Sequence, residues 1–159
     1  MIDRYVTEGI PCIHSDHKRG GELAAQALLS AGCKNVLYFA SSATERGCSM
    51  DRYRRFAEVC KQHKCKITAI DAGSKILNFQ SGPTIWKKYI SYFDGIDGLF
   101  TADVTAAACM KMLQKKGIKI PKKLKVVGYD GLDFTRFLTP ELTTVCQNCL
   151  LYTSDAADE

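Results

Sequence analysis

Residues 126–130 read Val-Val-Gly-Tyr-Asp, an apolar run that ends abruptly at a carboxylate. Three other mostly apolar runs precede it, at 36–39, 67–70 and 98–101. The runs recur about every 30 residues, which is the length of one strand with its crossover helix. Since they are apolar at successive positions, both faces of the strands must be covered, as in a parallel sheet between layers of helices. The sequence therefore predicts an α/β fold.

Helical patterns fill the intervals between these runs, with apolar residues three and four positions apart and glycine near the helix ends. A first helix should bury Leu23, Ala24, Ala27 and Leu28 before Gly32, and a second, over 50–63, should bury Tyr53, Phe56, Val59 and Cys60. A third begins near Pro83, and a fourth carries Val104, Ala107, Ala108, Met112 and Leu113 before Gly117. A short last strand is expected at 142–145.

The composition is that of one soluble globular domain, because 46% of the 159 residues are hydrophobic and 25% are charged. No apolar run approaches the roughly 18 residues that a membrane span needs. Eight cysteines are scattered through mostly apolar runs, which favours reduced thiols in a cytoplasm over a disulfide framework. The Cys-x-x-Cys at 146–149 stands without a second pair, so we expect no structural zinc.

The formal net charge is +5, and many of the bases are lysines between 111 and 125. No aromatic residue or arginine interleaves with these lysines, although both are typical of a nucleic-acid surface. We therefore interpret them as a solvated helix end, with contact to a polyanion as the alternative.

Polar side chains follow the ends of the predicted strands. Asp16 lies beyond the apolar residues 11–13, Asp103 beyond the run at 98–101, and Asp130 ends the last run. In open parallel sheets, ligands bind beyond the carboxyl ends of the strands. Arg46 and Arg52 follow the strand at 36–39, so we expect a polar rim there that suits a hydroxylated ligand. Helix capping is the alternative role for Asp16 and Asp103.

Sequence signatures of enzymes are mostly absent. The chain contains no Gly-x-Gly-x-x-Gly after a strand, no phosphate-binding loop, no Gly-x-Ser-x-Gly and no His-Glu-x-x-His. His14 and His17 flank Asp16, but a turn between strand and helix explains them better than a partial metal site does. We therefore expect no catalytic activity, no cofactor and no metal.

Several motifs, in their order, resemble the effector-binding domain of the lactose-repressor and galactose-repressor (LacI/GalR) family of transcription regulators. The strongest block is Gly-Tyr-Asp at 128–130, followed by Thr-Pro-Glu-Leu-Thr-Thr-Val-Cys-Gln at 139–147. Ala-Asp at 102–103 and Gly-Ile-Lys-Ile-Pro at 117–121 precede it. The resemblance implies a type I periplasmic-binding-protein-like fold, in which two Rossmann-like subdomains hold the effector between them. Essentially one of the two subdomains is expected here.

The resemblance also implies a division of the chain. Residues 1–14 would end the amino-terminal subdomain, 15–142 would form the carboxy-terminal effector-binding subdomain, and 143–148 would be a strand that crosses back. Residues 149–159 do not resemble the continuation of the family, so we expect a non-native tail there. The helix-turn-helix headpiece that binds operator DNA is expected to be missing from this chain.

By resemblance, single residues receive roles as well. Arg52 matches the arginine that clasps effector hydroxyls or carboxyls, and Arg46 matches an upstream arginine that contacts ligand in purine-type members. Asp103 matches the acid after the third strand of the subdomain, and Asp130 matches the acid that typically takes sugar hydroxyls. Two residues depart from the pattern: Ala102 stands where many sugar-binding members have asparagine, and Arg55 replaces the usual glycine.

The function implied by the resemblance is effector sensing in a cytoplasmic transcription regulator. A sugar or a related small metabolite would be the effector, and the full-length protein would be a homodimeric repressor on operator DNA with no membrane partner. The alternative is a solute-binding protein of an uptake system, which shares the fold but delivers its ligand to a transporter.

Overall fold

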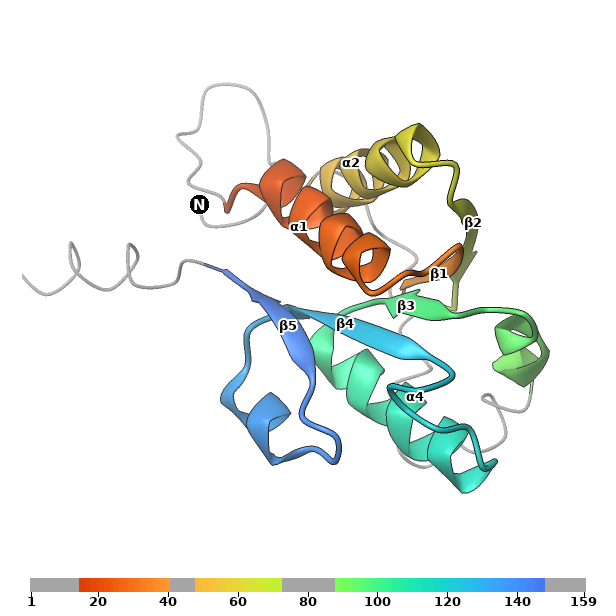
Figure 1. Ribbon diagram of the computed structural model, residues 1–159. Helices are drawn as coiled ribbons and strands as arrows, with labels where there is room; N and C mark the ends of the chain where they lie inside the picture. The colour runs from red at the N-terminus through yellow and green to blue at the C-terminus, as the bar shows by residue number, and fades with distance from the viewer. Residues whose placement is uncertain (1–14, 41–47, 73–87, 148–159) are drawn as a thin grey trace, which may run out of the picture.

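The computed structural model describes residues 15–40, 48–72 and 88–147, which form one parallel five-stranded sheet with helices on both faces (Figure 1). The strands are β1 (Asn35–Ala40), β2 (Lys66–Asp71), β3 (Gly98–Phe100), β4 (Lys125–Asp130) and β5 (Thr143–Cys146). Their order is β2-β1-β3-β4-β5, and every pairing is parallel. Each strand lies within one residue of its predicted bounds, so the prediction of a parallel α/β sheet is confirmed.

The described helices are α1 (His17–Ser30), α2 (Cys48–Gln62) and α4 (Asp103–Lys115), with short 3-10 helices η2 (Ile90–Phe93) and η3 (Asp133–Phe137). Helices α1 and α2 cover one face of the sheet, whereas α4 and η2 cover the other (Figure 1). The predicted start of the third helix near Pro83 lies outside the described residues. None of the described helices is long and apolar enough to cross a membrane.

The alternation of side chains along β1 divides the core into two layers. Val36 and Tyr38 are buried in the cluster beneath α1 and α2, whereas Leu37 and Phe39 are buried in the cluster above α4. Successive side chains of a strand point to opposite faces, and here both faces are covered. The continuous apolar run that predicts a central strand is therefore a direct consequence of this layering.

Two helix faces differ from the prediction. On α1, the small side chains of Ala24 and Ala25 are fully buried, whereas Leu23 is 38% exposed. On α4, Ala106 is fully buried, whereas Val104 is 44% exposed. Spacing alone favours the larger side chains, but close packing of a helix on a sheet selects small ones wherever the backbones approach.

The described cysteines fit the prediction of thiols used as small buried hydrophobes. Cys33, Cys60, Cys65 and Cys109 are buried and free, and Cys146 is exposed and free. Burial raises the pKa of the Cys33 thiol to about 11 and, with Cys65 nearby, that of Cys60 to about 12. Burial also raises the pKa of Cys109, so these thiols stay protonated at neutral pH.

We predict that a thiol-alkylating reagent reacts with the exposed and the buried cysteines at different rates. In the folded protein at mildly alkaline pH, Cys146 should react at least about tenfold faster than Cys109, because only an accessible thiolate is a nucleophile. Mass spectrometry of the digested protein measures the rate at each position, and denaturation in urea should make the rates converge. Equal rates for Cys109 and Cys146 in the folded protein would contradict the burial described above.

Candidate functional site

A small hollow lies at the carboxyl edge of the sheet, between the ends of β1 and β3. It is lined by Tyr38, Phe39, Ala40, Arg52, Phe100, Thr101 and Ala102. The chain leaves β1 toward β2 on one side and later returns to β3 on the other, so this is the point where the strand order reverses. Open α/β sheets bind ligands at such a switch point, beyond the carboxyl ends of the strands.

The hollow is closed at its base by a bond between the two strands that flank it. The Thr101 hydroxyl, just after β3, donates a hydrogen bond of 2.5 Å to the carbonyl oxygen of Phe39 on β1. Thr101 is only 3% exposed, so this bond lies within the protein. It keeps the ends of β1 and β3 together where regular strand pairing stops.

Arg52 brings a cation from α2 to this hollow. Its guanidinium carbon lies 3.8 Å from the centroid of the Tyr129 ring, and Tyr129 is buried on β4. The Tyr129 hydroxyl lies 3.1 Å from Nδ1 of buried His17, whose ring stacks on the tyrosine. A guanidinium over an aromatic face is attracted by about 0.5–1 kcal/mol when exposed and more when desolvated. The stack therefore holds the half-buried arginine at the lining of the hollow.

Two glycines at the start of α1 leave room for the Tyr129 ring and for the backbone of Arg52. A Cβ at Gly20 would lie 2.6 Å from Cε2 of Tyr129, and a Cβ at Gly21 would overlap the carbonyl oxygen of Arg52. Any larger residue would force α1 away from β4 or from α2. The pair thus lets one helix turn contact both partners of the Arg52–Tyr129 stack.

Asp130 ends β4 with a backbone that L-residues rarely adopt. Its φ is 126°, and Gly131 follows with a φ of 75°. Such a conformation costs on the order of 1–3 kcal/mol and is typical of functional sites. The Asp130 carboxylate accepts a 2.8 Å hydrogen bond from Nε2 of Gln147, while Oε1 of Gln147 accepts a 3.0 Å bond from the Ser15 hydroxyl. One amide therefore ties the carboxylate to the start of α1.

The structure places Asp103 inside the protein rather than at the lining of the hollow. Asp103 is fully buried, and its carboxylate accepts a 2.6 Å bond from the Thr144 hydroxyl and a 2.8 Å bond from the Leu132 N–H. A Cβ at Gly128 would overlap Oδ1 of Asp103, so the carboxylate lies directly on β4. Asp103 also makes no helix cap, because the cap position of α4 is Ala102. These bonds hold the loop after β4 and place the carboxylate away from the lining of the hollow.

Asp16 also has a structural role. It is the N-cap of α1, and its exposed carboxylate accepts a 2.8 Å bond from the Arg19 N–H, so the capping alternative holds. Arg46 and His14 lie outside the described residues. Among the residues that the structure describes, no group of three or more His, Cys, Asp or Glu side chains could hold a metal ion.

Sequence reasoning missed several residues that build the site. Tyr129 and Gln147 belong to the motifs at 128–130 and 139–147, but the sequence assigns neither of them a function in the site. For His17 the sequence suggests only a turn or a partial metal site. The adjacent Gly20 and Gly21 near a helix start were a usable signal, because paired glycines there indicate close approach of another backbone or ring. Gln147 had no local signal, since its partner Ser15 lies 132 residues earlier.

Comparison with known proteins places this architecture in a family. The family model for the periplasmic binding protein-like domain matches residues 25–159. The chain belongs to this family. A curated relative, the ribose operon repressor of Halalkalibacterium halodurans, is 34% identical over 147 residues, which are 92% of this chain and 43% of that repressor. The chain thus spans less than half the length of that relative.

Solved structures of the periplasmic binding protein-like family agree. A LacI family transcriptional regulator from Enterococcus faecalis with bound ribose has a TM-score of 0.74 at 27% identity, over 94% of this chain and 54% of that one. A periplasmic binding protein/LacI transcriptional regulator from Alkaliphilus metalliredigens with D-xylulofuranose has a TM-score of 0.76 at 26% identity, over 92% of this chain and 55% of that one. The resemblance to LacI/GalR regulators and the type I fold are thereby confirmed.

We predict that Asp103→Asn lowers the free energy of unfolding by about 1–3 kcal/mol, because it leaves a buried hydrogen-bonding group unsatisfied. Urea denaturation measures this as a lower midpoint with an unchanged slope. The matched control is Asp133→Asn on the exposed first turn of η3, which should change stability little. Equal stability of the two variants would refute the holding role of Asp103.

Proposed function

We propose that this chain is the carboxy-terminal effector-binding subdomain of a LacI/GalR-type transcription regulator that senses a sugar. The observation that carries the proposal is the placement of Arg52, stacked on Tyr129, at the hollow where the strand order reverses. Asp130 follows Tyr129 directly at the end of β4. Its relative named a ribose operon repressor supports the same function.

The chemistry of the two side chains fits a polyhydroxylated ligand. A guanidinium offers a planar fork of donors, and a carboxylate accepts from two hydroxyls, so the pair can bind adjacent hydroxyls of a sugar ring. Each charged hydrogen bond contributes about 1.5–3 kcal/mol. Ribose is the first ligand to test, because a related regulator from Enterococcus faecalis holds it. Arg46 remains part of the proposed ligand set.

The proposed division of the chain keeps the expected boundaries. Residues 1–14 would end the amino-terminal subdomain, 15–142 would be the effector-binding subdomain, 143–148 the crossing strand, and 149–159 a non-native tail. The other half of the cleft and the operator-binding headpiece would belong to the rest of the regulator. We place that regulator in the cytoplasm, as a repressor.

A homodimer is part of the proposal, and an exposed apolar surface supports it. Leu132 is 41% exposed and Phe137 is 85% exposed at the two ends of η3, and Val104 on the first turn of α4 is 44% exposed. The Asp103 carboxylate accepts from the Leu132 N–H, so the first turn of α4 and the residue before η3 are neighbours. Large apolar side chains exposed on neighbouring elements favour a protein interface.

The regulator is favoured over an uptake binding protein because the relative compared above is an operon repressor. In the regulator, the sugar would shift the balance between open and closed arrangements of the two subdomains. Such a shift requires that the sugar bind one arrangement more tightly than the other. We propose no catalytic activity for this chain.

Long-read sequencing of the source DNA across both ends of the reading frame tests the class of protein. We expect an in-frame helix-turn-helix segment upstream, because a regulator of the LacI/GalR type requires a headpiece that binds operator DNA. An upstream secretory signal peptide would instead establish the uptake protein and overturn the proposed function.

We predict that Arg52→Met and Asp130→Asn each weaken D-ribose binding to the intact regulator by at least about tenfold, the loss expected for one charged hydrogen bond. Isothermal titration calorimetry measures the affinity. Arg54→Met is the matched control, because its side chain is 71% exposed on the same helix and, within the described part of the chain, forms one ion pair, with Asp51 at 3.9 Å. Unchanged affinity in both site variants would remove these residues from the sugar site.

A further inference from the structure

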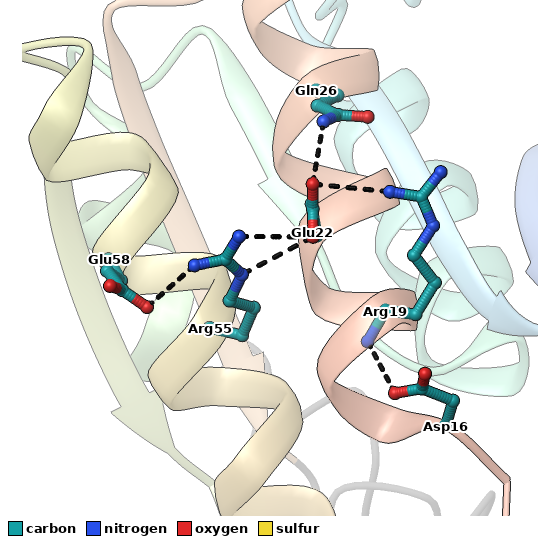
Figure 2. Close-up of polar contacts among 6 residues, drawn as sticks. All are labelled: Asp16, Arg19, Glu22, Gln26, Arg55 and Glu58. Carbon is teal, nitrogen blue, oxygen red and sulfur yellow. Dashed lines mark hydrogen bonds and ion pairs between the residues drawn. The ribbon is translucent and has the colours of Figure 1, made fainter.

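Glu22 of α1 is the centre of a charged network that joins α1 to α2 (Figure 2). Its Oε2 accepts from Nη2 of Arg55 at 3.2 Å and from Nε at 3.4 Å. Its Oε1 forms an ion pair with Nη1 of Arg19 at 3.2 Å and accepts a hydrogen bond from Nε2 of Gln26 at 3.1 Å. Arg55 also donates to Glu58 at 2.9 Å, so its guanidinium is held between two carboxylates.

This network lies beside a close backbone contact between the two helices. Gly21, whose Cβ would overlap the Arg52 carbonyl oxygen, directly precedes Glu22. Arg55 follows Arg52 by three residues, and residues three apart are neighbours on a helix surface. The ion pair and the backbone contact therefore join the same turn of α1 to the same turn of α2.

The rotation of α2 about its axis decides where the Arg52 side chain lies. A backbone contact at Gly21 limits how far apart the helices are, but it leaves α2 free to roll, because glycine has no side chain to interlock. The side chain of Arg55 supplies a second point of attachment, only 33% exposed and directed at Glu22. Two points of attachment restrict the roll of α2, whereas one does not.

Arg55 is not part of the lining of the hollow. Its guanidinium is engaged with Glu22 and Glu58, whereas Arg52 lines the hollow over Tyr129. The hydrogen bonds to these carboxylates raise the pKa of Arg55. Arg55 thus remains a cation whose charge is directed between the helices.

We propose that Arg55 is a positioning residue, which binds Glu22 to fix the roll of α2 and thereby holds Arg52 over Tyr129 at the hollow. The consequence for sugar affinity rests on the proposed function, whereas the placement of Arg52 does not. The residue stands where the family resemblance leads one to expect glycine.

The test uses nuclear magnetic resonance on the 159-residue chain, read at the side chain of Arg52. A guanidinium over the Tyr129 ring has its δ protons and its Nε proton shifted upfield by the ring current. In Arg55→Met, which keeps the apolar stem but removes the donors, we expect this shift to fall by at least about half. In the control Arg54→Met, the shift should stay as in the unmodified chain.

A second variant and a second readout make the result decisive. Glu22→Gln is nearly isosteric and removes the negative charge that Arg55 binds. It therefore replaces Arg55→Met in the test if Arg55→Met does not fold. Arg55→Lys restores the charge and should recover part of the shift. An unchanged Arg52 shift in both Arg55→Met and Glu22→Gln would overturn the positioning role.

The affinity for D-ribose separates this inference from the proposed function. In the intact regulator, Arg55→Met should weaken binding by about threefold, which lies within the range for a partly exposed ion pair. A lost Arg52 shift supports the positioning role whether or not ribose affinity changes. A lost shift with unchanged ribose affinity, together with unchanged affinity in Arg52→Met, would overturn the sugar contact of Arg52 alone.

Discussion

The close approach of α1 to β4 and α2 is the constraint on which the site depends. Gly20 lies against the Tyr129 ring and Gly21 against the Arg52 carbonyl, so one turn of α1 sets the distances of both. An aromatic ring buried on the sheet can then support a cation that comes from a different helix. Without the two glycines, α1 would stand off and the arginine would lose its platform.

The opposite face of the sheet is organised around a buried carboxylate. Asp103 begins α4, lies on Gly128 of β4, and binds both the N–H of Leu132 and the hydroxyl of Thr144. A buried charge of this kind is stable only when its oxygens are satisfied, and here two separate segments satisfy them. Asp103 thus holds the loop that begins at Asp130 from the α4 face of the sheet. On the opposite face, α1 contacts Tyr129, the residue before Asp130.

The strands and the general place of the site could be predicted from sequence, because apolar runs and the residues after them are local patterns. The burial of the Asp103 side chain could not be predicted from sequence. An acidic residue after a strand gives the same sequence pattern whether its side chain contacts a ligand, caps a helix or lies in the core. The partners of Tyr129 and Gln147 were equally hidden, because His17 and Ser15 lie 112 and 132 residues away in the chain. Long-range pairs of this kind depend on the assembled fold and leave no spacing in the sequence.

The contact between Gln147 and Asp130 connects the candidate site with the segment proposed to cross between subdomains. Gln147 follows β5 directly and donates to the same carboxylate that we propose for the sugar hydroxyls. A sugar hydroxyl that binds Oδ1 of Asp130 would share that oxygen with Nε2 of Gln147 or displace the amide. Because the amide also accepts from Ser15 at the start of α1, either change acts on both ends of the subdomain. Asp130 has a strained backbone, with a φ of 126°, so a change in the contacts of its carboxylate acts on the turn at which the chain leaves β4.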